Sequence, residues 1–357
     1  MRISEKILSF SNVKHFGLYK RYGVLAARSM TFQRFRNGFS GAIDYILMKS
    51  NPSCYPVVVK VETSAVCNLS CPGCLQGQNK SNFKSSMRMP LDLFCKILDE
   101  DRGRSVIFVL YHRGEPFLNV DLFSMISCLT RENLVSSVSS NFSLPFARCD
   151  FEAMVDSGLS HLIVSVDGAS QDVYGVSREG GNLDLVVHNI RELIAVRRRR
   201  GSRTPLIEQQ CVVYSHNRHE LGKVTELARS LGVDRVTFVP DVTRDHRMVL
   251  GQANRAESAG SEFRSGSPPG SRLGPLLLPQ CSWPWFSVLV KWNGEILPCC
   301  IYDWTREKFD FGNINDASLH AIWHGPRYRR LRQALAQRQA SSFVRDPFCR
   351  YCPGLGS

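Results

Sequence analysis

Short runs of β-branched and apolar residues alternate with segments of helical periodicity from about Val57 onward. Apolar runs bounded by polar turns predict strands, and apolar residues that recur every three or four positions predict helices. The predicted strands are Val57–Thr63, Val106–Tyr111, Leu134–Ser139, His161–Val166, Leu206–Val213 and Arg235–Val239. The predicted helices are Leu91–Asp101, Leu122–Arg131, Phe151–Ser157, Leu183–Arg197 and His219–Leu231.

This alternation predicts an α/β fold, because parallel strands need a crossover connection that is usually a helix. Six such units with right-handed crossovers predict a partial (β/α)6 barrel over residues 51–250. The following stretch is rich in Gly, Ser, Pro, Ala and Arg without apolar periodicity, so residues 251–279 are predicted to be a flexible linker. Residues 280–357, which contain a cluster of cysteines, are expected to form a small separate C-terminal domain, and the family resemblance described below implies that it is an auxiliary iron–sulfur domain.

Residues 1–50 are expected to form a basic helical N-terminal extension that carries much of the formal charge of +13. Its basic residues alternate with aromatic ones, a texture that also suits peripheral contact with a membrane surface or contact with nucleic acid. Packing on the enzyme body is the simpler expectation. The chain has neither a long uninterrupted apolar stretch nor a signal-peptide pattern, so we expect a soluble, cytoplasmic protein.

Thirteen cysteines in a chain with no export signal indicate reduced thiols and favour metal binding over disulfides. Cys67, Cys71 and Cys74 form a C-x3-C-x2-C motif directly after the first predicted strand, where α/β proteins place their sites. Three thiolates on a four-iron cluster leave one iron open to a small molecule, whereas electron-carrying clusters use four cysteines. Zinc is the alternative, although a structural zinc site needs a fourth ligand.

Further motifs follow at the ends of the next strands, and together they resemble the radical S-adenosylmethionine (SAM) superfamily. The resemblance implies a [4Fe-4S] cluster on the three cysteines, with SAM bound to its open iron. It also implies cofactor-binding roles for the following residues: Gly114, Glu115, Pro116, Ser139, Asn141, Ser165, Asp167 and Arg178. The sequence departs from the family pattern at Arg113, where a glycine is usual, and at Gly73, where many members have an aromatic residue.

The C-terminal cysteines Cys281, Cys299, Cys349 and Cys352 resemble the SPASM and twitch auxiliary-cluster domains, and the arrangement is similar to that of the butirosin-type aminocyclitol dehydrogenase. The resemblance implies a second [4Fe-4S] cluster held by these four residues; structural zinc is the alternative. Val288–Val290 and Glu295–Leu297 are predicted to pair as a hairpin, with Asn293-Gly294 as a two-residue turn. The full SPASM pattern has three further cysteines, so one auxiliary cluster is expected rather than two.

Cys300 and Asp303 are the candidate catalytic residues; for Cys300 a core thiol is the first expectation, and an alternative ligand or a hydrogen-atom donor are the other two. The resemblance implies reductive cleavage of SAM and hydrogen abstraction from a substrate C–H bond, with flavodoxin or ferredoxin as electron donor. We expect oxidation of a small sugar-like or aminocyclitol-like molecule, and radical modification of a ribosomally made peptide is the alternative. A zinc-stabilised nucleic-acid-binding protein is the alternative of another class, although nucleic acid is not the expected partner.

Overall fold

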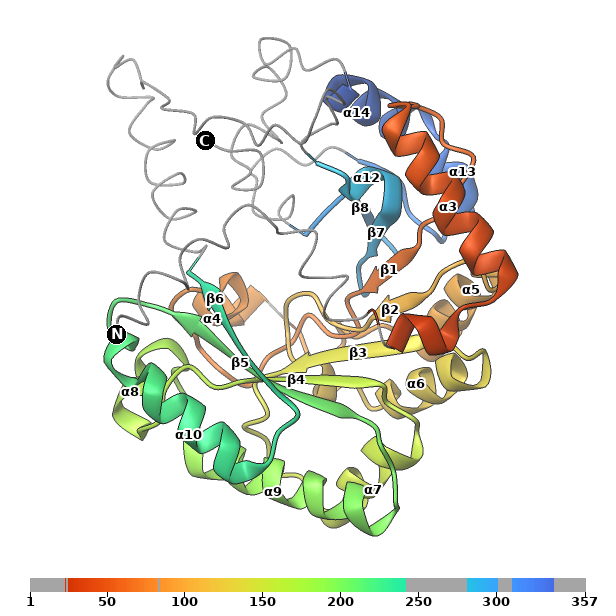
Figure 1. The fold of residues 1–357 in the computed structure, drawn as a ribbon. Helices are drawn as coiled ribbons and strands as arrows, with labels where there is room; N and C mark the ends of the chain where they lie inside the picture. The colour runs from red at the N-terminus through yellow and green to blue at the C-terminus, as the bar shows by residue number, and fades with distance from the viewer. Residues whose placement is uncertain (1–22, 24, 83, 242–280, 301–309, 337–357) are drawn as a thin grey trace, which may run out of the picture.

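The computed structural model describes residues 23, 25–82, 84–241, 281–300 and 310–336 of the 357. One curved sheet of eight strands runs through this part of the chain, and helices cover its outer face (Figure 1). The strands are β1 (Val58–Val61), β2 (Ile107–Val109), β3 (Val135–Ser140), β4 (His161–Ser165), β5 (Leu206–Val213), β6 (Arg235–Pro240), β7 (Ser287–Val290) and β8 (Ile296–Leu297).

The helices divide into a main set around the sheet and shorter pieces in the connections. Between residues 32 and 231 the described helices are α3 (Phe32–Ile46), α4 (Leu75–Gln78), η2 (Lys80–Asn82), α5 (Leu91–Asp101), η3 (Pro116–Leu118), α6 (Leu122–Arg131), α7 (Arg148–Asp156), α8 (Gln171–Ser177), α9 (Leu183–Arg199), η4 (Arg218–Glu220) and α10 (Leu221–Leu231). The C-terminal three are α12 (Trp283–Phe286), α13 (Leu319–Trp323) and α14 (Pro326–Ala336).

The strand order is β6-β5-β4-β3-β2-β1-β7-β8, and every neighbouring pair except β7 and β8 is parallel. The predicted α/β fold with a partial barrel is therefore confirmed. Strand β5 and helices α5 and α6 have the predicted bounds. Helix α7 begins three residues earlier than predicted, at Arg148, because the Asp150 carboxylate accepts a hydrogen bond from the Ala147 backbone N–H at 2.7 Å and caps the first turn.

The predicted C-terminal hairpin is present as β7 and β8, but its turn differs from the prediction. The Gly294 N–H donates to the Lys291 carbonyl, and Gly294 has φ +85°. The loop therefore has three residues with glycine in the left-handed position, not the two-residue turn expected from Asn293-Gly294.

Strand β7 also pairs with β1 in parallel, from Val58 opposite Ser287 to Val61 opposite Val290. This pairing extends the barrel sheet into the C-terminal segment and was not predicted. It has a consequence for the site, because β1 leads into the cysteine loop and β7 lies between Cys281 and Cys299.

The two faces of β1 have different surroundings. Val59 and Val61 are fully buried in the main core, among side chains such as Phe94 and Phe108 that lie between the sheet and the outer helices. Lys60 lies between them in sequence and so points to the opposite, inner face of the barrel. Its ammonium group lies 4.8 Å from the centre of the Tyr111 ring.

A fully buried arginine connects the C-terminal helices. Arg332 of α14 donates from Nε to the Pro284 carbonyl at 2.8 Å and from Nη1 to the Trp323 carbonyl at 2.9 Å. Its guanidinium also stacks 4.3 Å from the Trp323 ring centre, a cation–π contact. Burial lowers the pKa of Arg332 to about 10. These bonds join α12, α13 and α14 into one unit.

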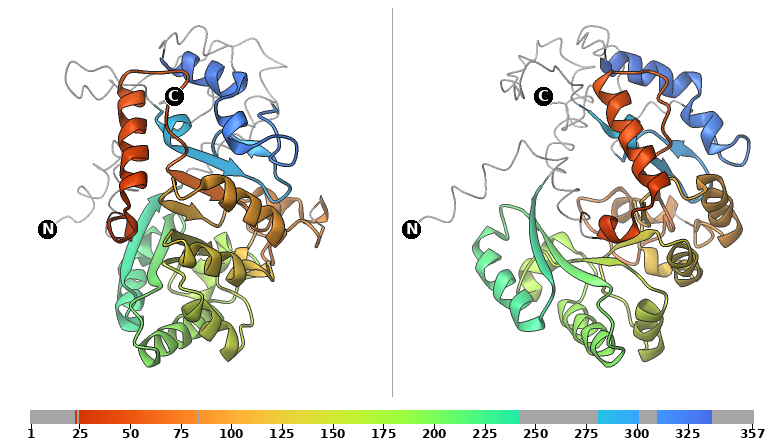
Figure 2. Two further views of the ribbon diagram at one scale, coloured as in Figure 1. Left: turned by 90° about the vertical axis from the view of Figure 1, so that its right-hand side faces the viewer. Right: turned by 45° about the vertical axis from the view of Figure 1, so that its right-hand side comes forward.

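Helix α3 lies within the predicted N-terminal extension and packs against α12, where the Tyr45 ring lies 5.5 Å from that of Trp285 (Figure 2). Residues 1–22 of this extension and the predicted linker at 251–279 lie outside the described residues. Among the helices that the structure describes, none combines the length and the apolar character needed to cross a membrane.

Candidate active site

The cysteine loop lies between the C-terminal end of β1 and helix α4. Cys67, Cys71 and Cys74 are all partly buried, and the Cys74 N–H donates to the Cys71 carbonyl at 3.1 Å. Helix α4 packs tightly on this loop, because a Cβ added at Gly77 would lie 2.5 Å from the Cys71 carbonyl oxygen. Only glycine fits there, so the path of the loop depends on that residue.

The protein environment acts on two of the three thiols. Burial, with a contribution from the Glu115 carboxylate, raises the pKa of Cys67 to about 12. Burial also raises the pKa of Cys71, and the positive charge of Arg178 opposes that shift. A metal reverses this tendency, since coordination deprotonates a thiol outright.

These residues fit the expected cluster by the chemistry of their donors. Three thiols on one loop at the carboxyl end of a parallel sheet supply the soft ligands that iron–sulfur clusters use. Within the described residues, no three His, Cys, Asp or Glu side chains are gathered closely enough to hold one metal ion. A four-iron cluster does not need that geometry, because each thiolate binds a different iron.

Glu115 is buried in the connection after β2. Its Oε2 accepts from the Asn141 backbone N–H at 2.9 Å, and its Oε1 accepts from the Phe117 N–H at 3.2 Å. Burial raises the pKa of Glu115 to about 7, although these hydrogen bonds favour the ionised form. Gly114 before it has φ +40°, and a Cβ there would collide with the Ser64 carbonyl. The carboxylate therefore ties the end of β2 to the end of β3.

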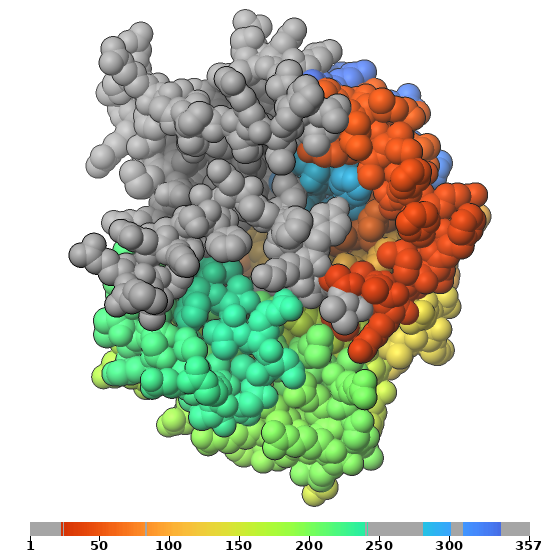
Figure 3. Space-filling view, in the orientation of Figure 1, coloured from red at the N-terminus to blue at the C-terminus, as the bar shows by residue number. Residues whose placement is uncertain are grey.

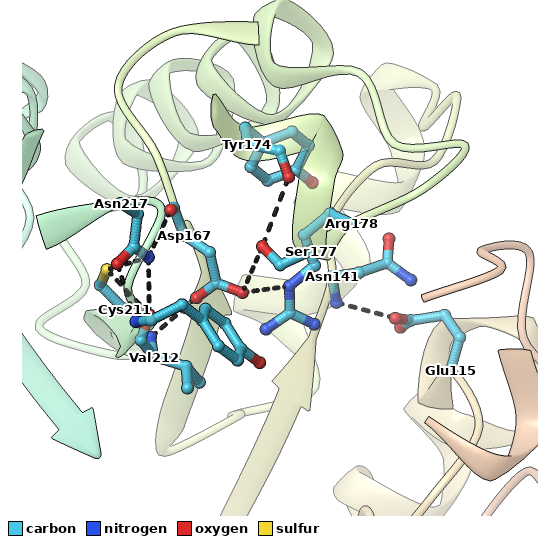
Figure 4. A network of polar contacts seen from close by, with 10 residues as sticks. Glu115, Asn141, Asp167, Tyr174, Ser177, Arg178, Cys211, Val212 and Asn217 are labelled. Atoms are coloured by element: carbon cyan, nitrogen blue, oxygen red, sulfur yellow. Dashed lines mark hydrogen bonds and ion pairs between the residues drawn. The ribbon is translucent and has the colours of Figure 1, made fainter. Parts of the chain in front are cut away.

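Asp167, directly after β4, forms the centre of a polar network (Figure 4). Its Oδ2 lies 2.6 Å from Nε of Arg178, and its Oδ1 accepts from the Val212 N–H at 2.7 Å. The Asp167 side chain is fully buried. Although burial opposes it, the Asp167 carboxylate raises the pKa of Arg178, which stays charged. In Figure 4 the Nε atom of Arg178 faces the Asp167 carboxylate.

Asn141 connects this region to the cysteine loop. Its side-chain nitrogen lies 3.8 Å from the Cys67 sulfur and 2.9 Å from Oδ1 of Asn68. Two other predicted residues lie on neighbouring strands: Ser139 is half-buried on β3, and Ser165 ends β4 and is buried. Pro116 begins η3, for which Glu115 provides the N-cap. The predicted cofactor residues thus come from three successive strand ends and from α8, which ends just before Arg178.

Three residues of this region were not predicted. Asn217 donates to the Asp167 carbonyl at 2.8 Å and to the Val212 carbonyl at 2.7 Å, which holds the two strand ends together. Ser140 hydrogen-bonds to the Glu115 carboxylate. Asn68 donates to the Ser143 carbonyl at 2.8 Å. Ser140 lies inside the Ser139–Asn141 motif and could have been found there, but Asn217 has no local signal because its partner is 50 residues away.

The predicted auxiliary ligands are only partly described. Cys281 precedes α12 and Cys299 follows β8, and both pack against the same apolar cluster of Trp285, Leu289, Leu297, Leu331 and Leu335. Cys349 and Cys352 lie outside the described residues, as does Asp303. Cys300 is partly buried. Burial lowers the pKa of the inward-facing Lys60, and Cys300 lies close enough to oppose that shift. The described half of the auxiliary site therefore lies beside the barrel interior.

The C-terminal cysteine segment and most of the chain resemble known proteins. The SPASM family model, an iron–sulfur cluster-binding domain, matches residues 281–353. The tungsten-containing aldehyde ferredoxin oxidoreductase cofactor-modifying protein of Pyrococcus furiosus is 23% identical over 296 residues, covering 75% of this chain and 81% of that protein. Mycofactocin maturase MftC of Mycolicibacterium smegmatis is 26% identical over 323 residues, covering 83% of this chain and 77% of its own.

Among solved structures, SuiB of Streptococcus suis bound to the precursor peptide SuiA has a similar fold. The TM-score is 0.59 at 13% sequence identity, and the match covers 83% of this chain and 71% of SuiB. These matches favour a radical SAM enzyme over a zinc-stabilised nucleic-acid-binding protein. The chain belongs to the radical SAM superfamily and is a member with a C-terminal SPASM iron–sulfur cluster-binding domain.

Proposed function

We propose that this enzyme cleaves SAM reductively at a [4Fe-4S] cluster on Cys67, Cys71 and Cys74 and oxidises a small, polar, sugar-like substrate. The observation that carries the proposal is the convergence of Glu115, Asn141 and Arg178 on the cysteine loop, with the Asn141 amide 3.8 Å from Cys67. When bound, the cluster and SAM supply a 5′-deoxyadenosyl radical that removes hydrogen from a C–H bond. The protein supplies binding, orientation and exclusion of water.

The polar network has a specific task in this proposal. Asp167 fixes Arg178 through Nε, and the terminal nitrogens then bind the carboxylate of SAM in a charge-assisted contact. Glu115 orders the backbone of Asn141 while its remaining lone pairs accept from the cofactor's ammonium group. Gly114, Pro116, Ser139 and Ser165 are assigned to the same cofactor site because they lie at or just after the carboxyl ends of β2, β3 and β4.

The substrate is proposed to lie in the barrel interior between the two cysteine sites. Lys60, Tyr111 and Arg113 come from β1 and from the end of β2, and Arg113, which replaces the usual glycine, is only 8% exposed. Burial lowers the pKa of Lys60, a shift that Cys300 opposes and the positive charge of Arg113 reinforces, and this supports a position of Lys60 near Cys300. A cationic and aromatic lining of this kind favours a hydroxylated or acidic small molecule. The proposed ligands of the cluster that accepts the substrate's second electron are Cys281 and Cys299, together with Cys349 and Cys352 from outside the described residues.

Arg178→Met should weaken SAM binding on the order of 10- to 100-fold, because a charged hydrogen-bond partner contributes about 1.5–3 kcal/mol. Iron content should not change, since Arg178 is not a ligand. Equilibrium dialysis of anaerobic holoenzyme measures the affinity. Arg200→Met is the matched control, because Arg200 pairs with Asp156 at the surface and both side chains are about half exposed. Equal affinity in the two variants would remove Arg178 from the cofactor site.

Peptide modification is the second candidate function, because SuiB, whose fold is similar, was solved with a precursor peptide. The two candidate functions differ in the molecule that gives up hydrogen to the 5′-deoxyadenosyl radical. Reduced holoenzyme and SAM are incubated with the low-mass or the peptide fraction of cells of the source organism grown in deuterated medium, and 5′-deoxyadenosine is analysed by mass spectrometry. We expect 5′-deoxyadenosine to gain deuterium when the low-mass fraction is used. Protease treatment of that fraction should not change the result. Deuterium from the peptide fraction alone, lost after protease, would establish the peptide candidate. Deuterium from neither fraction would contradict hydrogen abstraction.

A further inference from the structure

Helix α3 is attached to the enzyme through its polar side. Arg34 is 3% exposed, and its guanidinium donates to the carbonyls of Asn133 at 2.7 Å and Glu132 at 2.8 Å. Asp44 is 1% exposed and accepts from the Ser53 N–H and hydroxyl. Asn37, between them, exchanges hydrogen bonds with the Tyr55 backbone. Satisfied buried polar groups hold a helix in one orientation, so the direction of its other face is well defined.

The opposite face of α3 is apolar and exposed. Phe32 is 79% exposed, and Phe35 and Phe39 are each 57% exposed, with their two rings stacked 6.0 Å apart. Ile43 and Ile46 continue the stripe with the three- and four-residue spacing of one helix face. Met30 and Leu47 extend it beyond the two ends of α3. In Figure 3 the atoms of α3 form part of the edge of the molecule. A surface helix normally buries such a stripe, so this apolar stripe of α3 indicates an interaction site.

The sequence segment that carries the stripe is basic. Residues 6–43 contain seven Lys or Arg and neither Asp nor Glu. Within the described part of this segment, Arg28 and Arg36 are exposed; Arg28 precedes Phe32 by four residues and Arg36 directly follows Phe35. A second copy of the chain in a two-fold dimer would bring these same cations face to face. The occupant must therefore be anionic as well as apolar.

The shape of the surface favours lipid over protein. The stripe lies on the convex outer side of a single helix, so a protein partner would have to offer a matching groove. A bilayer interface adapts to a helix lying in its plane, takes up phenylalanine below the headgroups and presents phosphates to arginine. We propose that α3 docks the enzyme on an anionic membrane surface through the apolar stripe and its flanking arginines. This inference is independent of the proposed reaction.

Vesicle binding by the full-length holoprotein tests the proposal. Phosphatidylcholine vesicles containing phosphatidylserine should sediment the protein, phosphatidylcholine vesicles alone should bind it much less, and high salt should weaken binding. The variant F32S/F35S/F39S should bind the anionic vesicles more weakly, on the order of 10- to 100-fold. These side chains are exposed, so iron content and melting temperature should not change. The matched control is V120S/V176S, which removes exposed apolar side chains elsewhere; Val120 is 86% and Val176 is 53% exposed.

Three outcomes would overturn the proposal. The wild-type protein could fail to bind anionic vesicles, or F32S/F35S/F39S could bind as well as V120S/V176S. A wild-type dimer in light scattering that the triple variant abolishes, without vesicle binding by either protein, would assign the stripe to a second copy.

Discussion

A variant with Cys67, Cys71 and Cys74 all replaced by Ala should produce no 5′-deoxyadenosine above background. The physical reason is the loss of every thiolate from the loop between β1 and α4, which leaves no cluster to deliver an electron to SAM. The variant should lose about half of the iron, since the proposed C-terminal cluster would be the only one left. Chromatographic measurement of 5′-deoxyadenosine after anaerobic reduction is the direct test.

The control for this experiment removes three cysteines elsewhere. Cys95, Cys128 and Cys149 lie on helices α5, α6 and α7, away from the cysteine loop. Replacing all three by Ala should leave both the iron content and SAM cleavage close to the wild-type values. Full activity of the loop variant, or equal losses in the two variants, would contradict the assignment of the loop as the cleavage site.

The second large effect is expected at the C-terminal cysteines. Replacing Cys349 and Cys352 by Ala should preserve some 5′-deoxyadenosine formation but eliminate the oxidised product. An oxidation must remove a second electron from the substrate, and the auxiliary cluster is its proposed acceptor. The roles separate because four thiolates leave no open iron for SAM, whereas three leave one.

Loss of the fold would imitate this result, so two measurements accompany it. The melting temperature and SAM affinity of the double variant should stay near those of the wild-type protein, and Cys300→Ala serves as the single-cysteine control. The decisive measurement uses the variant in which Cys67, Cys71 and Cys74 are replaced by Ala. The auxiliary cluster is the one that we propose remains in it. Its electron paramagnetic resonance spectrum should not respond to SAM, and a clear change would show an open iron and refute the acceptor role.

Local sequence determined much of the fold. The bounds of β5, α5 and α6 were predicted because hydrophobic period and capping are properties of neighbouring residues. The cysteine spacing also predicted a ligand loop, since Cys67, Cys71 and Cys74 lie within eight residues after one strand. The motifs at the next strand ends were predicted to lie near this loop, because parallel strands bring their carboxyl ends to one edge of the sheet.

Tertiary structure decided the contacts between distant residues. The pairing of β7 with β1 depends on which edge of the sheet is open. The hydrophobic pattern of either strand does not identify the strand beside it. Asn217 hydrogen-bonds both to Val212 and to Asp167, which lies 50 residues before it in the chain. The hydrophobic period of residues 32–46 predicts an amphipathic helix but does not say which face packs inward. Burial of Arg34 and Asp44 decided that the phenylalanines point outward, because Arg34 hydrogen-bonds to the backbone of Glu132 and Asn133 and Asp44 to that of Ser53.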